Sequence, residues 1–363
     1  MTSLRTGLVR LLLLVSFFVA LPVHAEQFGL FTYRVSDDEV TISGYPQDAT
    51  GPVEIPAEID GLPVTSIGFG AFSYSGITSV SISDSVTSIG DRAFFGCNTL
   101  TSVSIPDNVT SIGWGAFYDC TALTLIEVDA LNPSYRSLAG VLFDKNLTRL
   151  ILYPGGKSGG YAIPDSVTKI GNHAFAGRSG LTSITIPESV TSISHGAFSH
   201  CTGLTSVSIP ESVTSIELSA FSSCTGLHSV IFLGDAPFLE GNTFLNPAPD
   251  FTIYYLAGST GFTSPVWHGS PTVMLEDPVS PTTLWLVSQG LPHDADLNQD
   301  LNGDGVSLLM AYALGLDPHA NLSGRLPAPV VSGNSLSLSF PAAAPGITYT
   351  VQTSTDLQFW TTE

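Results

Sequence analysis

The chain has 363 residues, of which 43% are hydrophobic, so it can bury a substantial core and is long enough for two or three domains. It carries 31 acidic and 11 basic residues, and its formal net charge is −20. A nucleic-acid backbone would be repelled by this charge, and we therefore expect no nucleic acid among the partners.

Residues 1–25 have the pattern of an export signal. Arg5 and Arg10 precede an apolar run, residues 11–21, and Val-His-Ala forms a small-residue cleavage site before Glu26. The run is shorter than the roughly 20 apolar residues that cross a bilayer, and no later stretch is long and apolar enough. We expect cleavage after Ala25 and a mature chain without a transmembrane segment, either secreted or held at the cell surface.

An internal repeat dominates residues 65–281. Its clearest marker is a phenylalanine, usually preceded by alanine, which recurs 22 or 23 residues apart except for one interval of 58. A period of this length is typical of leucine-rich repeat solenoids, in which each copy forms one coil and stacked coils bury a continuous core. We expect these rings to stack along a single axis: Phe72, Phe94, Phe117, Phe175, Phe198, Phe221 and Phe244.

Each copy predicts two short strands. In the copy that contains Phe117, inward apolar residues alternate with outward Ser102 and Ser104, and this strand ends before Pro106. Residues 109–112 predict a second extended piece that turns the corner. The fold class is therefore mainly β, a solenoid of parallel β coils with a 23-residue period.

The consensus "LTSVSIPDSVTSIGxxAFxGC" resembles the BspA-like leucine-rich repeats of bacterial surface proteins, over roughly Thr65 to Phe244. By this resemblance residues 26–64 form an N-terminal β cap made of a polar-faced strand pair. Residues 125–163 form an insertion with strands near 141–143 and 150–153, and a closing segment ends the array by residue 281. The resemblance also implies a role in adhesion.

Four cysteines stand three residues after a repeat phenylalanine, at the same position of four coils. Two interpretations remain open. The first is a row of buried thiols, since cysteine packs well as a small hydrophobic residue. The second is a pair of disulfides, Cys97 with Cys120 and Cys201 with Cys224, because neighbouring coils are close enough for a bridge.

Other polar residues of the repeat are expected at its surface. The histidines at 173, 195, 200 and 228 occupy variable positions, which usually face solvent. Serine and threonine files are expected to solubilise the coils and to form hydrogen bonds along the ladder, or else to offer an extended binding sheet. The outward files are Ser79, Ser102, Ser183, Ser206 and Ser229, with Ser81, Ser104, Thr185 and Ser208 beside them, and Thr65, Thr87, Thr110, Thr168, Thr191 and Thr214.

The composition changes at residues 282–320, where two helical stretches, 283–288 and 307–314, flank an acidic loop. Oxygen-bearing side chains alternate along the loop, so that they can converge on one hard cation, and Gly305 stands where the loop must bend. The loop resembles a dockerin or EF-hand-type calcium site, although Ala311 occupies the position of the last carboxylate. The predicted calcium ligands are Asp294, Asp296, Asn298, Asp300, Asn302, Asp304 and the carbonyl of Val306. The alternative is a solvated acidic linker.

Residues 321–363 resemble the start of a β-sandwich module, with strands expected at 335–340 and 347–352. No nucleophile, zinc or paired-carboxylate motif is found, so we expect no enzymatic activity. The sequence predicts an exported, non-catalytic repeat protein that binds an extracellular protein or a surface glycan. The alternatives are a structural spacer of the cell envelope, an enzyme whose site is gathered by the insertion, or an ice-binding threonine surface.

Overall fold

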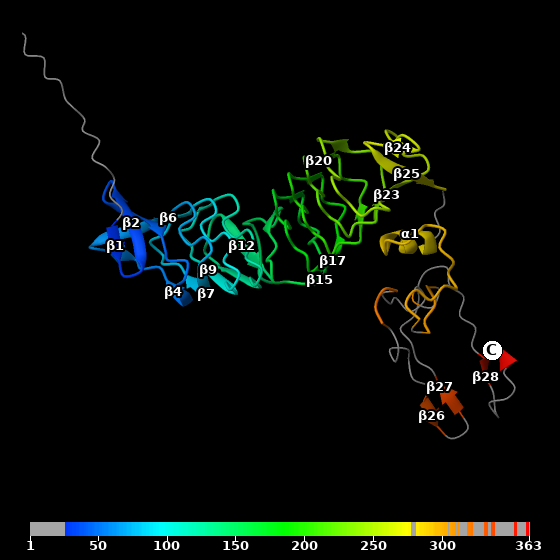
Figure 1. Cartoon of the computed structure of the whole chain (residues 1–363), viewed down its shortest axis with the longest axis horizontal. Helices are drawn as coiled ribbons and strands as arrows, with labels where there is room; N and C mark the ends of the chain where they lie inside the picture. The colour runs from blue at the N-terminus through cyan, green and yellow to red at the C-terminus, as the bar shows by residue number, and fades with distance from the viewer. Residues whose placement is uncertain are drawn as a thin grey trace, which may run out of the picture.

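The computed structural model describes residues 26–276, 281–303, 305–308, 311, 318–321, 330–332, 335–337, 352–353 and 361–362. The predicted export signal, residues 1–25, lies outside this part of the chain. Figure 1 shows an elongated stack of coils from β1 (Glu26–Phe28) to β25 (Ser270–Leu275), with α1 (Pro281–Ser288) beside the last coils. The predicted mainly β solenoid is confirmed.

An antiparallel sheet closes the N-terminal end of the stack. It contains β1, β2 (Phe31–Ser36) and β3 (Glu39–Gly44), paired in that order. β3 then pairs in parallel with β6 (Leu62–Ile67), and β5 (Glu58–Ile59) pairs antiparallel with β6. The cap thus leads directly into the parallel rows of the solenoid, as expected, but with three antiparallel strands instead of two.

Two rows of parallel strands run along the solenoid. The first row contains β6, β8 (Ser88–Ile89) and β10 (Ser111–Ile112), and after the insertion β14 (Arg149–Leu152), β16 (Lys169–Ile170), β18 (Ser192–Ile193), β20 (Ser215–Ile216) and β22 (Phe238–Leu239). The second row contains β4 (Thr50–Glu54), β7 (Gly76–Ser81), β9 (Ser102–Ile105) and β11 (Leu125–Val128), then β15 (Gly159–Ala162), β17 (Leu181–Thr185), β19 (Ser206–Ile209), β21 (Ser229–Phe232), β23 (Thr252–Leu256) and β25. β24 (Val266–Trp267) pairs antiparallel with β25.

Equivalent positions of successive copies lie side by side in these rows. Ser79 is opposite Ser102 in the second row, and Ser192 is opposite Ser215 in the first. A step of one repeat along the chain therefore equals a step of one strand across the sheet, about 4.8 Å. Each copy meets nearly identical neighbours, and this explains why the sequence is repeated.

The repeat rings stack in two files. In the first file, neighbouring ring centroids lie 5.0 and 5.2 Å apart; its members are Phe72, Phe94 and Phe117. In the second file the spacing is 4.8 to 5.5 Å; its members are Tyr153, Phe175, Phe198, Phe221 and Phe244. No ring contact joins Phe117 to Tyr153 in the described part of the chain. The expected single axis is therefore wrong at the insertion, where Tyr153 begins a new file.

All four cysteines are buried free thiols. Each Sγ donates a hydrogen bond to the carbonyl oxygen of the phenylalanine one coil earlier: Cys97 to Phe72 (3.0 Å), Cys120 to Phe94 (3.1 Å), Cys201 to Phe175 (3.0 Å) and Cys224 to Phe198 (3.0 Å). Burial raises the pKa of the Cys224 thiol to about 12. The thiol interpretation is thus the correct one, because the position supplies a donor to a buried carbonyl.

The insertion interrupts the first row of strands. β12 (Tyr135–Leu138) and β13 (Val141–Asp144) pair antiparallel, β13 pairs antiparallel with β14, and β14 rejoins the row by pairing in parallel with β16. At the open edge of β10, the Tyr135 hydroxyl accepts a hydrogen bond from Ile112 N (3.0 Å) and donates one to Thr110 O (3.4 Å). The core is accordingly divided into two apolar clusters, one on each side of the insertion.

α1 packs against the outer face of the second row. Val287 is fully buried in a cluster with Ile231, Tyr254 and Leu275. Ser229 is only 2% exposed, and its hydroxyl donates to Val287 O at 2.7 Å. The prediction that Ser229 faces solvent is therefore wrong, because α1 covers this end of the serine file.

Only some of the residues for which C-terminal elements are predicted belong to the described part of the chain. The first helical stretch, 283–288, is confirmed within α1, whereas most of the second, 307–314, lies outside the described residues. The same holds for most of the predicted strands 335–340 and 347–352. The strand pairs described there are β26 (Val330–Ser332) with β27 (Ser335–Ser337) and β28 (Gln352–Thr353) with β29 (Thr361–Thr362).

Candidate functional site

The acidic loop after α1 is folded around Asp300. Its Oδ1 accepts a hydrogen bond from Gly303 N (2.9 Å), and its Oδ2 accepts one from Gly305 N (2.8 Å). Gly303 and Gly305 have φ values of 72° and 89°, in the region that favours glycine. The loop therefore bends at the glycine where the calcium-loop pattern predicts a bend.

The other predicted calcium ligands are spread along the loop. Asp296 Oδ1 accepts from Asn298 N (2.9 Å), Asn302 Nδ2 donates to Ala320 O (2.8 Å), and Asp294 lies 3.9 Å from the His293 ring nitrogen Nδ1. Val306 is buried beside Ala311, while Asp304 lies outside the described residues. The described residues contain no group of three or more His, Cys, Asp or Glu side chains arranged to hold a metal. Calcium binding stays a prediction.

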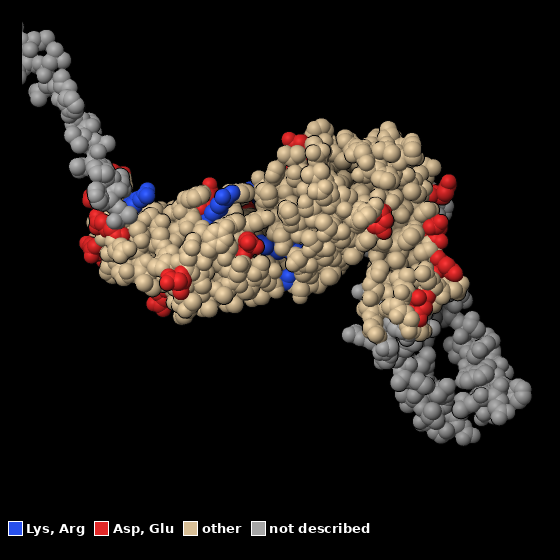
Figure 2. Space-filling model, in the orientation of Figure 1, with Lys and Arg blue, Asp and Glu red and all other residues tan. Residues whose placement is uncertain are grey.

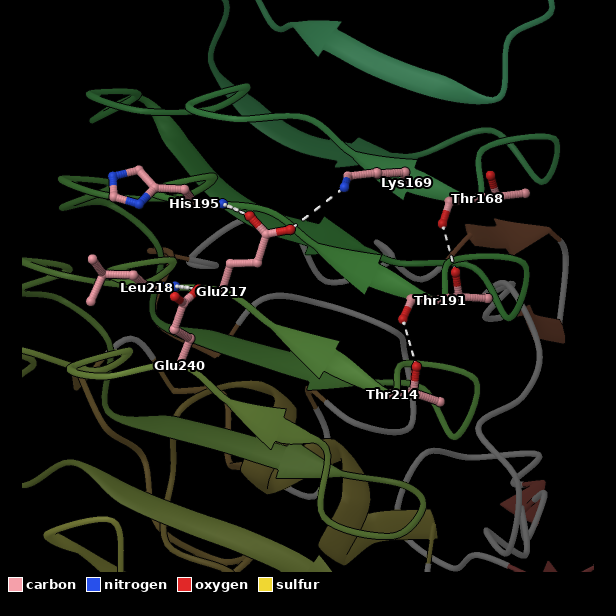
Figure 3. Close-up of polar contacts among 8 residues, drawn as sticks. All are labelled: Thr168, Lys169, Thr191, His195, Thr214, Glu217, Leu218 and Glu240. Carbon is pink, nitrogen blue, oxygen red and sulfur yellow. Dashed lines mark hydrogen bonds and ion pairs between the residues drawn. The ribbon is translucent and has the colours of Figure 1, made fainter.

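The threonine file serves the solenoid itself. Figure 3 shows three of its members side by side: Thr191 Oγ1 donates to Thr168 O and Thr214 Oγ1 donates to Thr191 O, both at 3.3 Å. Thr87 makes the same bond to Thr65 O, at 3.2 Å. These hydroxyl groups therefore satisfy backbone carbonyls of the preceding coil, as the simpler interpretation of the file predicts.

Carboxylates link the turns of the C-terminal coils in a similar way. Glu217 Oε2 accepts a hydrogen bond from His195 N (2.9 Å), and its Oε1 lies 3.5 Å from Lys169 Nζ (Figure 3). Glu240 Oε2 accepts from Leu218 N at 3.4 Å. Both glutamates are thus occupied by contacts between coils.

A different surface carries exposed aromatic side chains. We call it the aromatic row; it follows the turns of three successive N-terminal coils and consists of Phe69, Tyr74, Arg92, Phe95, Trp114 and Tyr118. The exposed fractions are 72% for Phe69, 57% for Tyr74 and 47% for Trp114. Tyr74 meets Phe95 edge-on at 5.3 Å, and Phe95 stacks on Tyr118 at 5.8 Å. The rings of Tyr74, Phe95 and Tyr118 are therefore in contact from coil to coil, and Phe69 lies exposed on the same turn as Tyr74.

Arg92 completes the aromatic row. Its guanidinium lies 4.8 Å from the Trp114 ring centroid and 5.7 Å from that of Phe95. The serine and threonine files contain no aromatic residues, whereas the turns that form the aromatic row do. The sequence analysis did not single out these aromatic residues. The signal was present: the variable positions around Ala-Phe read "FG" and "SY", "DR" and "FG", "WG" and "YD" in the first three copies.

His173 is an exception to the expectation that the repeat histidines face solvent. Its ring lies 5.6 Å from Trp114, 6.4 Å from Tyr118 and 5.0 Å from His195. Its Nδ1 atom is buried without a hydrogen-bond partner. Burial lowers the pKa of His173, and the neighbouring His195 lowers it further. The prediction is therefore wrong for His173, which extends the aromatic row across the insertion. His195 and His228 are half-buried, and His200 is exposed as expected.

A cavity opens at the insertion because one coil is short at its turn. Gly171 N donates to Leu150 O and Tyr153 N to Ala174 O, both at 2.8 Å, so Leu150 and Tyr153 occupy the places of the repeat isoleucine and phenylalanine. Only residues 151–152 separate them, where regular coils such as that of Phe72 have residues 68–71. The missing residues leave a cavity of about 260 Å³, lined among others by Trp114, Tyr118, Arg149, Leu152, Asn172 and His173.

Basic residues are concentrated in and just after the insertion, and one of them, Arg149, lines the cavity. More than half of the 11 lysines and arginines lie within residues 136–178, and none lies between Arg178 and Arg325. Figure 2 shows acidic side chains along the whole of this face, including the N-terminal end and the part around and after α1, and most of the basic side chains on this face over the middle of the solenoid. The members of this basic group are Arg136, Lys145, Arg149, Lys157, Lys169 and Arg178.

Among the described residues, no helix is long and apolar enough to cross a membrane. No curated protein matches the chain. Similar solved structures include a leucine-rich repeat protein from Eubacterium ventriosum (22% identity, 70% of this chain and 84% of that one, TM-score 0.43). Another is from Bacteroides ovatus (21%, 69% and 77%, TM-score 0.44), and a leucine-rich cell surface protein is from Faecalibacterium prausnitzii (21%, 76% and 99%, TM-score 0.40).

The repeats also match a known protein family. Residues 65–155 and 159–252, together just over half of the chain, match the model of the BspA type leucine rich repeat region (6 copies). These segments are the ones in which the coils, the ring files and the thiol ladder have been described. The chain therefore belongs to the family of BspA-type leucine-rich repeat proteins.

Proposed function

We propose that this protein is exported to the cell surface, has no catalytic role and mediates adhesion by binding an extracellular protein through the aromatic row. Two observations support export and surface location: the signal pattern of residues 1–25 and the membership of a family whose repeats are typical of cell-surface proteins. A repeat family of this kind provides a scaffold for protein binding, because its stacked coils present an extended surface.

The observation that carries the proposal is the exposure of the aromatic row. Tryptophan, tyrosine and arginine are the residues that contribute most binding energy at protein interfaces. Here they lie on successive coils, and the ring centroids of Tyr74, Phe95 and Tyr118 follow one another at 5.3 and 5.8 Å. Contiguous apolar surface of this kind is uncommon on a chain that has no partner. The row therefore fits a partner that lies along the turns.

The hydroxyl-bearing faces fit a partner less well. The threonine hydroxyls donate to backbone carbonyls of the solenoid, and α1 covers part of the serine file. A structural spacer without a ligand is the alternative, and it leaves the exposed aromatic row without a role.

The test is retention of extracellular proteins by the immobilised mature chain, in the presence and absence of calcium. The informative variant is Phe69→Ser combined with Tyr74→Ser. Its matched control is Phe238→Ser, because Phe238 is 71% exposed, like Phe69, but lies on β22 near the other end. We expect a retained protein to be lost with the double variant and kept with the control. If nothing is retained in either condition, the spacer is the better account.

A further inference from the structure

We propose that the cavity beside Trp114 binds a pyranose ring that carries a carboxylate, as in a uronic acid. This proposal does not rest on the protein partner proposed above, although Trp114 belongs both to the aromatic row and to the cavity wall. It follows from the shape of the cavity, from the chemistry of its lining and from the distribution of charge around it.

The shape fits a single ring. The cavity exists because the coil of Tyr153 lacks two residues at its turn, so it is bounded by the turn of the Phe117 coil on one side and that of the Phe175 coil on the other. Trp114 and His173 approach across this gap to 5.6 Å between ring centroids. A volume of about 260 Å³ lies below the range for drug-sized ligands, so the site suits one ring and not an extended peptide.

The lining is apolar inside and polar at the rim. Ile112, Ile151 and Leu152 contribute aliphatic surface, and Trp114 contributes an aromatic ring. Arg92 lies over the Trp114 ring at 4.8 Å but does not line the cavity, so it holds this ring in place from the side of its own coil. An aromatic wall combined with a few polar groups is the usual arrangement of a site for a small amphipathic ligand.

The rim carries a positive charge that is not neutralised. Arg149 is exposed and lines the cavity, and no carboxylate in the described residues pairs with it. Its Nε lies beside Gly171, 3.2 Å from where a β-carbon at that residue would stand, and Asn172, the next residue, also lines the cavity. The nearby Asp144 is occupied, because its Oδ1 accepts hydrogen bonds from Thr148 N (2.7 Å) and Arg149 N (2.8 Å).

This unpaired arginine selects an anionic ligand. A guanidinium binds a carboxylate with two parallel hydrogen bonds, and these are among the stronger polar contacts in proteins. In a chain with a net charge of −20, the basic group between residues 136 and 178 is also the region least repulsive to an anion. An acidic peptide would pair with Arg149, but its carboxylates would not cover the aliphatic lining or the Trp114 ring.

The experiment compares two probes by calorimetric titration of the full mature chain. Methyl β-D-glucuronide carries a carboxylate on C5 of the ring, and methyl β-D-glucoside carries a hydroxymethyl group on the same carbon. We expect the glucuronide to bind about 10-fold more tightly or better, since one charged hydrogen-bonded pair distinguishes the two ligands. Added salt should reduce the difference.

Two variants locate the site. Arg149→Gln should abolish the preference for the glucuronide, whereas Arg34→Gln removes the same charge from an exposed arginine on β2 in the N-terminal cap and should leave it unchanged. Trp114→Ala should weaken the binding of both sugars. An unchanged thermal midpoint for Arg149→Gln shows that the fold of this variant is intact.

Three results would overturn the proposal: equal affinity for the two sugars, no binding of either one, or a preference that survives Arg149→Gln. Binding of a poly-glutamate peptide without binding of the glucuronide would also overturn it in favour of an acidic protein partner. Retention of a protein through Phe69 and Tyr74 is measured separately, so failure of one proposal is distinguishable from failure of the other.

Discussion

Arg178 donates a hydrogen bond from Nε to the carbonyl oxygen of Tyr153, at 2.7 Å. Arg178 stands three residues after Phe175, where four other copies have cysteine, and Tyr153 is the core ring of the preceding coil. The bond therefore replaces the thiol-to-carbonyl bond of the regular coils. Arg178 is 2% exposed, and burial lowers the pKa of its guanidinium.

Replacing this arginine should destabilise the insertion. Arg178→Ala leaves a void and deprives the Tyr153 carbonyl of its donor, so we expect a loss of about 2–4 kcal/mol in the free energy of unfolding. Arg136→Ala is the control: that side chain is exposed on β12, and its loss should change stability by less than about 0.5 kcal/mol. Urea unfolding of the two variants measures the difference. Equal midpoints would contradict a structural role for Arg178.

The ring files should account for much of the stability of the coils. Phe198 is fully buried between Phe175 and Phe221, at 4.8 and 5.0 Å. Phe198→Ala should cost about 3–5 kcal/mol, because it removes a buried ring and leaves a cavity. Phe238→Ala removes an exposed ring and should cost less than about 0.5 kcal/mol. Thermal and urea midpoints provide the measurement, and similar losses for the two variants would be inconsistent with a stacked core.

The stability of the fold should decrease at acidic pH because of His173. Its folded-state pKa lies below the unfolded value of about 6.5, so the unfolded chain takes up the proton first as the pH falls. Stability is therefore lost from about pH 6.5 downward, until His173 itself is protonated in the folded state. His173→Asn removes this contribution, and asparagine tolerates the φ of 54° found there.

The measurement is the change in urea midpoint between about pH 7.5 and about pH 5.5. We expect a smaller change in His173→Asn than in the parent chain. His200→Asn is the matched control, since His200 has a φ of 59° but is exposed, and it should keep the parent response. An identical pH response in all three chains would show that His173 is not the titrating group.

Calcium binding by the acidic loop is the prediction that the structure leaves open. Calorimetric titration of the mature chain should show one site with a dissociation constant on the order of 10⁻⁴–10⁻³ M, as in extracellular calcium modules, since Ala311 supplies no carboxylate. Asp300→Ala should abolish the signal, and Asp165→Ala, on an exposed turn of the solenoid, should not. If the titration with calcium gives no heat of binding, or if binding survives Asp300→Ala, the acidic-linker interpretation is favoured.

The coils were predictable because every copy has the same neighbours. The position of Phe198 in one copy implies a ring above it and a ring below it, so the period alone locates the core. Tyr153 was not predictable in this way, because its coil is two residues shorter at the turn and the repeat pattern is lost. The two ring files follow from that one irregularity.

The binding surfaces were harder to predict than the core. The aromatic row lies at variable positions, which a consensus treats as uninformative. Phe95 and Tyr118 each follow a repeat phenylalanine and are 23 residues apart, so the period implied the contact that the structure shows. The sequence contained a signal that Ser229 is covered: Ile231 stands opposite Ser208, at an outward position where four earlier copies have serine or threonine. The calcium ligands remain a sequence prediction, since Asp304 lies outside the described residues.

The central claim is that the repeated coils hold an aromatic row along their turns for a protein partner. Hydroxyl-radical footprinting of the mature chain, free and in complex with the protein that it retains, tests this claim most directly. The account predicts that oxidation of Phe69 and Tyr74 falls in the complex while oxidation of Phe238 stays the same. Protection of Phe238 together with unchanged oxidation of Phe69 and Tyr74 would contradict it.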